Sequence, residues 1–153
     1  MIYLQVPKTL GVPAETLAKI EAAAQETLVQ VRAGLDAELT VVLSDDAQLH
    51  ELNRQFLGID APTDVLSFPA DELDPDSETL YLGDVLISDP RAKTQAAAGG
   101  HPVSAELQLL TAHGVLHLLG YDHASETDKA AMWAIQANIL TRLGCPITAP
   151  SAE

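Results

Sequence analysis

Three histidines in the C-terminal half of the chain have the spacing of a metal site. His113, His117 and His123 occupy positions i, i+4 and i+10 of the run HGVLHLLGYDH. Residues four apart on a helix share a face, so the first two imidazoles can bind one ion together. Gly120 can end that helix in a left-handed conformation and let the chain return His123 as a third ligand. Three protein nitrogens leave a fourth position open, which is typical of a catalytic zinc site.

The residue after the first histidine argues against a peptidase. The spacing HxxxHxxGxxH is that of the metzincin peptidases, which place a glutamate base directly after the first histidine. Gly114 holds that position here, and a glycine cannot accept a proton. We therefore expect a metal-assisted hydrolase whose substrate is not a peptide, and we assign no catalytic side chain beyond water activated by the metal. Zinc is the default for three neutral imidazoles, although nickel, copper or iron would also accept them.

Other polar side chains are candidates for supporting roles around the metal. Asp122 adjoins a ligand and could accept a ring N–H, which would orient the imidazole. Glu106 lies on the same helix face as His113 but about 10 Å away along the axis, too far to bind the ion. It is expected instead as a partner in the cleft wall. Thr63 and Ser67 could donate hydrogen bonds to a phosphate, and for each of these residues an ordinary structural role is equally open.

Five further residues have simpler expectations. Asp64 and Asp84 fall in expected strands, and either could line the cleft. His50 and His101 have polar neighbours in the sequence, so we expect both to be exposed. Cys145 is the single cysteine of the chain, which excludes an internal disulfide and is expected to be an inert thiol.

The composition limits the function classes. The chain has 153 residues, which fits one domain, and its formal net charge is −14. Its eight lysines and arginines are scattered, so it lacks the basic footprint of a nucleic-acid-binding protein, and no DNA binding is expected. An RNA substrate would need local contacts, a protein partner or the metal itself. Because no apolar run suits a membrane helix and no secretory leader is visible, we expect a cytoplasmic protein.

Periodicity predicts an α+β fold: a small mixed four-stranded sheet covered by about five helices. Strands are expected over residues 1–6, 39–43, 63–68 (ended by Pro69) and 82–88. Helices are expected over residues 13–35, 45–58 (opened by Asp45 with Gln48), 89–98, 104–119 (capped by Ser104) and 125–144 (capped by Ser125). The fourth helix is apolar nearly all round, so it should be the buried central helix, with the metal cleft around it.

The organisation expected from this pattern is a single metal-dependent hydrolase domain over residues 1–145, followed by a flexible tail over 146–153. The stretch 71–78 contains five carboxylates. It lacks the residue order and the glycine of an EF-hand, so we expect a solvated, mobile loop rather than a calcium site.

Several segments, taken in order, resemble the YbeY family of bacterial endoribonucleases. They are LN at Leu52-Asn53, APTDVLSFP at Ala61–Pro69, LGDVLIS at Leu82–Ser88 and HGVLHLLGYDH at His113–His123. The resemblance covers roughly residues 39–143. It implies zinc-dependent cleavage of single-stranded RNA, in 3′-end maturation of small-subunit ribosomal RNA and in ribosome quality control. It also implies a mixed sheet covered by helices, with the three histidines at the floor of a cleft.

The chain departs from the family pattern at one position. Where the family usually has an aromatic residue, arginine and glycine, this chain has Phe56, Leu57 and Gly58. The resemblance implies that the arginine faces the cleft and helps with RNA, whereas leucine cannot hold a phosphate or neutralise a developing charge. Arg54 could substitute from one helical turn earlier. Alternatively, the protein is a weak nuclease.

Two other functions stay open on the sequence alone. One is a non-catalytic, zinc-stabilised ribosome assembly factor whose acidic surface docks on a ribosomal protein. The other is a metal hydrolase of another substrate class, such as a peptide or a small ester. The expected partners are single-stranded or ribosomal RNA and the small ribosomal subunit or its proteins, with no membrane contact.

Overall fold

Four strands form one mixed sheet in the order β1-β2-β4-β3. The computed structural model describes residues 1–31, 36–147 and 149. The strands are β1 (Ile2–Gln5), β2 (Ala37–Ser44), β3 (Val65–Leu73) and β4 (Leu80–Ser88). The pairs β1–β2 and β2–β4 are parallel, and β3 runs antiparallel to β4. The mixed sheet of an α+β fold is therefore confirmed.

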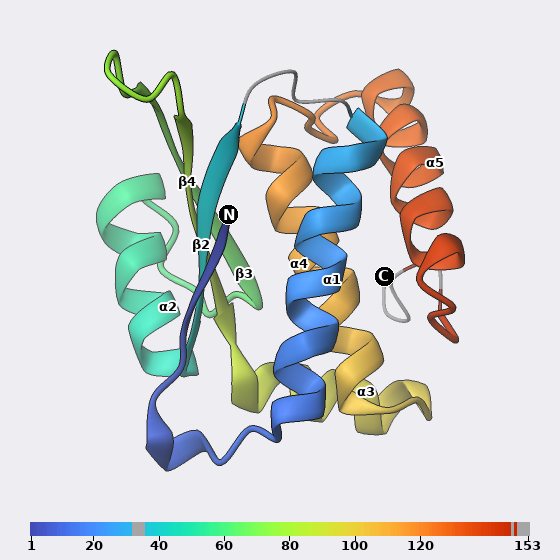
Figure 1. Cartoon of the computed structure of the whole chain (residues 1–153). Coiled ribbons are helices and arrows are strands. Elements are labelled where there is room, and N and C mark those ends of the chain that lie inside the picture. The colour runs from blue at the N-terminus through green and yellow to red at the C-terminus, as the bar shows by residue number, and fades with distance from the viewer. Residues whose placement is uncertain (32–35, 148, 150–153) are drawn as a thin grey trace.

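Helices cover the two faces of this sheet unequally (Figure 1). On one side lie α1 (Ala14–Val31), α4 (Val103–Leu118) and α5 (Glu126–Arg142), and on the other lies α2 (Asp46–Leu52). Between β4 and α4, α3 (Asp89–Gly99) turns the chain at one end of the sheet. A 3-10 turn, η1 (Lys8–Leu10), precedes α1, and a π-helical turn, η2 (Asn53–Leu57), extends α2. Within the described residues, no helix is long and apolar enough to cross a membrane.

The central helix is α4, as its apolar composition predicted. Twelve of its 16 residues are buried, and it packs against β3, β4, α1, α3 and α5. Its N-terminus differs from the prediction, because the cap is Pro102 and not Ser104. Pro102 has an extended backbone, and its carbonyl accepts from the amides of Ala105 and Glu106, so the first turn begins two residues earlier than a cap at Ser104 would place it.

The third strand runs past Pro69, where its end was predicted. In the described sheet β3 pairs only with β4, and an edge strand tolerates a residue that has no N–H to donate. The register shifts between Pro69 and Glu72, which accommodates the irregularity. The prediction of a loop over all of 71–78 is therefore wrong, since its first three residues belong to β3 and only the remainder turns the chain into β4.

Most of the other predicted helix ends agree with the structure. The Asp45 carboxylate accepts from the Gln48 amide at 2.8 Å, and the Ser125 hydroxyl accepts from the Asp128 amide at 3.0 Å. Gly58 follows η2 with a φ of 71°. The predicted end of the first helix falls on residues 32–35, outside the described residues. Of the predicted tail, Ile147 packs against the main hydrophobic cluster, while 148 and 150–153 lie outside the described residues.

Candidate metal centre

The three predicted histidines line one pocket of about 480 Å³. Each offers a ring nitrogen, and these three atoms all lie within 4.8 Å of one another. The Nε2 atoms of His113 and His117 are 3.1 Å apart. Two nitrogens bound tetrahedrally to one zinc ion at about 2.0–2.1 Å would lie roughly 3.3 Å apart. The spacing of the His113 and His117 donor atoms therefore fits a metal ion, and His123 lies close enough to offer a third.

The end of α4 explains how His123 reaches the other two histidines. The amide of Tyr121 donates to the Leu116 carbonyl at 3.0 Å, and the amide of Gly120 donates to the His117 carbonyl at 3.1 Å. These two bonds form a Schellman motif, which needs a residue with positive φ at its centre. Gly120 supplies it with a φ of 98°, so the chain folds back over the last turn of α4, as predicted.

A buried amide on α5 fixes the orientation of the His113 ring. The Nδ1–H of His113 donates to Oε1 of Gln136 at 3.0 Å. Because Oε1 can only accept, the ring proton lies on Nδ1, and Nε2 keeps a lone pair that points toward Nε2 of His117. This is the tautomer that a metal ligand requires.

Burial holds the His113 and His117 rings in the neutral form. Desolvation, with repulsion from the two neighbouring histidines, lowers the pKa of His113 from 6.5 to about 4. Desolvation also lowers the pKa of His117, with a further contribution from His123. A hydrogen bond with the Tyr121 backbone and the charge of Asp122 act in the opposite direction on His117. Neutral imidazoles near pH 7 can bind a metal without first losing a proton.

Sequence reasoning missed Gln136 and Trp133, both on α5. Gln136 is fully buried, and its Nε2 has no hydrogen-bond partner among the described residues. The Trp133 ring stands edge-on to the rings of His113 and His123, with centroids 5.6 and 5.5 Å away. The signal that could have found Gln136 is its place beside Met132 on the inward stripe of α5, since a polar side chain on an apolar stripe needs a partner.

Packing explains the glycine that follows the first histidine. A Cβ at Gly114 would collide with a methyl group of Val85 on β4 and lie 3.3 Å from Oγ of Ser67 on β3. The helix therefore approaches the sheet too closely for any side chain here. The Ser67 hydroxyl uses this proximity and donates to the Gly114 carbonyl at 2.8 Å.

The wall of the pocket contains several of the predicted residues. Thr63, Asp64 and Ser67 line it together with the histidines, and so does Leu57. Asp64 accepts from the Gln95 side chain at 3.3 Å. Because the Ser67 proton already bonds to a backbone carbonyl, we do not expect this hydroxyl to donate to a phosphate as predicted. No lysine or arginine is among the described residues that line this pocket.

The structure does not bring Arg54 into the pocket. Its guanidinium donates twice to Glu51, at 3.1 and 2.5 Å, and lies on the exposed side of the chain. Arg54 was expected to share a helix face with Leu57 because α-helical spacing was assumed. The segment is instead η2, a wider π-helical turn. The Asp122 carboxylate accepts from the Ala124 amide at 3.2 Å, and its charge opposes the lowering of the His117 pKa.

Glu106 and His101 form a buried pair away from the metal site, which corrects two expectations. Nε2 of His101 lies 2.7 Å from Oε1 of Glu106, and their side chains are only 5% and 4% exposed. The expectation that His101 is exposed is therefore wrong, and Glu106 does not line the metal pocket. His101 lies in the connection between α3 and α4, and Glu106 lies in the first turn of α4.

The remaining candidates also lie outside the pocket. His50 is half-exposed and bonds to Asp60 at 2.7 Å. Asp84 accepts from the Tyr81 hydroxyl at 2.5 Å instead of lining the cleft. Burial raises the pKa of the Cys145 thiol, which supports an inert role.

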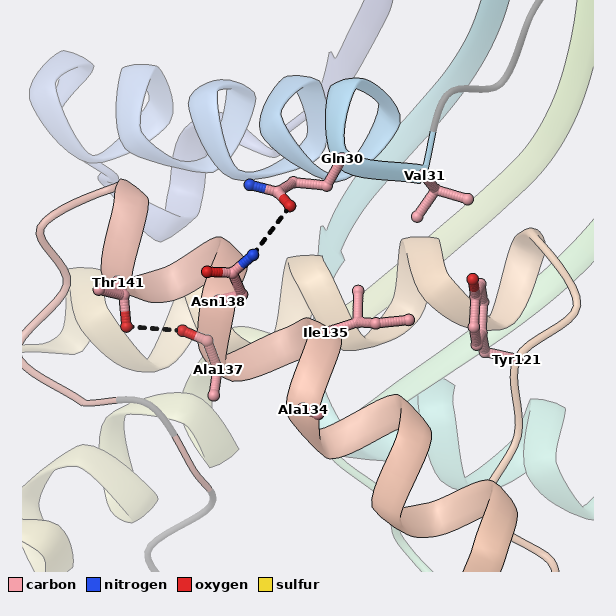
Figure 2. A pocket seen from close by; sticks show the side chains of 8 residues that line it. All are labelled: Gln30, Val31, Tyr121, Ala134, Ile135, Ala137, Asn138 and Thr141. Carbon is pink, nitrogen blue, oxygen red and sulfur yellow. Dashed lines mark hydrogen bonds between the residues drawn. The ribbon is translucent and has the colours of Figure 1, made fainter.

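A second hollow, between the end of α1 and α5, shows how α5 is held in place (Figure 2). Asn138 donates to the Gln30 side chain at 3.1 Å across this hollow. Tyr121 and Ile135 line its other end. The contact ties α5 to α1, and α5 in turn carries Gln136 to the metal pocket.

Comparisons with known proteins show the family of this chain. The family described as Endoribonuclease YbeY matches residues 6–144. A protein of Pelotomaculum thermopropionicum named Endoribonuclease YbeY is 48% identical over 124 residues, covering 79% of this chain and 82% of that protein. A protein of Chloroflexus aurantiacus with the same name is 44% identical over 154 residues, covering 95% of this chain and 99% of that protein.

A solved structure supports the fold. The solution structure of TM1509 from Thermotoga maritima has a TM-score of 0.57 and 24% identity, covering 97% of this chain and 95% of that one. The family match and the identities settle the relationship that the sequence motifs suggested: this chain belongs to the YbeY endoribonuclease family.

Proposed function

We propose that this protein is a metal-dependent endoribonuclease that cleaves single-stranded RNA, with zinc bound by His113, His117 and His123. The observation that carries the proposal is the convergence of three ring nitrogens within 4.8 Å in one pocket, in a chain of this family. The open pocket leaves room for a substrate beside the metal, as a catalytic site requires.

The side chains of the pocket prepare the site for a metal ion. A bound divalent cation supplies a Lewis acid for a phosphoryl oxygen and makes water a better nucleophile at neutral pH. Gln136 holds the His113 proton at Nδ1, and the return of the chain after Gly120 positions His123. Trp133 packs against two of the three imidazoles and restricts their movement.

Either of two nucleophiles is compatible with this pocket, namely water or the neighbouring 2′-hydroxyl of the RNA. Neither needs a protein base at position 114, where packing excludes one. The 3′ ends of the products distinguish the two routes, because only attack by the 2′-hydroxyl gives a cyclic phosphate.

The biological role that we propose with this activity is 3′-end maturation of small-subunit ribosomal RNA and ribosome quality control in the cytoplasm. It is supported by the motifs shared with the family, above all HGVLHLLGYDH over residues 113–123. The net charge of −14 argues for a partner that presents the RNA, because this surface repels free polyanions. The small ribosomal subunit or one of its proteins would meet that need.

The proposal is tested by cleavage of a labelled single-stranded RNA with zinc-loaded protein. We expect His117→Ala to abolish cleavage and His50→Ala, which removes a histidine outside the pocket, to retain it. Chelation should stop the wild-type reaction and added zinc should restore it. Equal cleavage by His117→Ala would identify a contaminating nuclease. If no preparation cleaves free RNA or ribosome-bound RNA, the protein is not a nuclease and the assembly-factor alternative gains support.

A further inference from the structure

Three large apolar side chains are exposed beside the metal pocket. Phe56, Leu57 and Ile59, which we call the apolar lip, are 63%, 60% and 52% exposed. They lie within four residues of one another, on η2 and the turn that follows it. Leu57 also lines the metal pocket, so the lip is continuous with the candidate metal centre.

Phe56 of the apolar lip packs against β3. The Phe56 ring meets the Phe68 ring of β3 edge-on, with centroids 5.5 Å apart and planes at 76°. Phe68 in turn packs against the small core cluster of Leu49, Leu66 and Leu86. A ring fixed in this way loses little conformational freedom when a planar group stacks on it.

The electrostatics of the pocket do not favour phosphate binding by side chains. Among the described residues that line it, Asp64 is the charged group outside the three histidines. The Arg54 guanidinium, three residues from Leu57 in sequence, is occupied by Glu51. The affinity of this region for RNA must therefore come from the metal and from uncharged contacts.

We propose that the apolar lip is a nucleobase subsite. The inference rests on the proposed function and deepens it: an unpaired base next to the cleaved phosphate stacks on Phe56 and contacts Leu57. Every base has an apolar π-face, so such a subsite accepts RNA without strict sequence preference. A single strand is required because a paired base is not free to leave its stack. A protein partner fits less well, since covering Leu57 would close the pocket.

The test measures binding, so that it does not depend on cleavage. Protein carrying His117→Ala is titrated with a labelled oligouridylate and with an abasic ribose-phosphate strand of equal length. We expect the base-bearing strand to bind more tightly, and Phe56→Ala to weaken it roughly 5- to 100-fold without changing the abasic strand. Val29→Ala is the matched control, because Val29 is 58% exposed on α1, outside the lip.

Two further measurements sharpen this test. Leu57→Arg adds a cation to the lip, so it should raise affinity for the abasic strand and steepen the salt dependence of binding. Equal affinity for both strands, or an unchanged affinity in Phe56→Ala, would overturn the subsite. So would sedimentation showing that Phe56→Ala dissociates a dimer, because the lip would then be an interface between copies. These binding measurements do not test the proposed function. That function would be refuted if the wild-type protein showed no metal-dependent cleavage of RNA.

Discussion

Nδ1 of His113 lies 3.0 Å from Oε1 of Gln136, across the contact between α4 and α5. This hydrogen bond decides which ring nitrogen of His113 is available to a metal. It also joins the histidine motif over residues 113–123 to α5, the helix that follows it in the chain. Removing the hydrogen-bond partner of a metal-binding histidine commonly weakens metal affinity by about 10- to 100-fold. Gln136 is therefore a positioning residue for the metal centre.

Gln136→Ala should weaken zinc binding by about 10- to 100-fold. Gln136→Glu should retain the affinity, because it keeps an acceptor for Nδ1–H and removes the unpartnered Nε2. Zinc affinity is measured by competition with a chromophoric chelator. Asn138→Ala serves as the control, since it also removes a hydrogen bond of α5, but one made to Gln30. If Gln136→Ala and Asn138→Ala weaken zinc binding equally, helix docking and not the ring contact is responsible.

Trp133 should report metal binding directly. It is the single tryptophan of the chain, and its ring centroid lies within 5.6 Å of two of the three imidazoles. Cobalt bound there should quench its emission through energy transfer to the ion, and excess zinc should reverse the quenching. His117→Ala should remove the response while leaving the emission of the metal-free protein nearly unchanged. Quenching that persists in this variant would show that cobalt binds elsewhere.

The metal-free protein should lose stability between pH 6.5 and about 4. The pKa of His113 is lowered from 6.5 to about 4, so in this range the unfolded chain binds a proton that the folded chain excludes. Unfolding free energy then rises with pH across the window, by at most about 3 kcal/mol for this group. Guanidinium unfolding at several pH values measures the slope. His113→Asn should flatten it relative to the wild type, and an unchanged slope would assign the effect to other groups.

The pair of Glu106 and His101 should matter for stability and not for the metal. Glu106→Ala leaves a buried histidine without its partner, which costs about 1–3 kcal/mol. Glu106→Gln keeps an acceptor and should cost less. Neither variant should change zinc affinity, because the pair does not line the metal pocket. A tenfold loss of zinc affinity in Glu106→Gln would restore the role in the cleft that the sequence suggested.

The parts of the site that could be predicted are those set by local geometry. His113 and His117 are one helical turn apart, and Gly120 ends the helix through its own positive φ. Neither relationship depends on what α4 packs against. The position of Gln136 could not be predicted, because it depends on how α5 docks against α4. The expectation that His101 is exposed failed for a different reason: its polar neighbours in sequence do not reveal that its ring is buried in a pair with Glu106, five residues further along the chain.

Backbone irregularities account for the other differences. Pro69 usually ends a strand, but it is accepted in β3 because that strand lies at the edge of the described sheet. The π-helical turn at η2 separates Arg54 from the face that Leu57 presents. Neither feature has a periodic signal, since both depend on the neighbours that the segment acquires on folding.

Gly114→Ala should destabilise the protein because the added methyl group meets Val85. Overpacking of this kind typically costs about 1–3 kcal/mol, and it should outweigh the gain in helix propensity over glycine. Val85→Ala removes the obstructing methyl groups at its own cost of a cavity. In combination the two substitutions should therefore cost less than the sum of the single costs, as measured by urea unfolding in a double-mutant cycle. Strict additivity would mean that α4 moves away from β4 instead of colliding with it, and Gly114→Ala would then also weaken zinc binding by displacing His113.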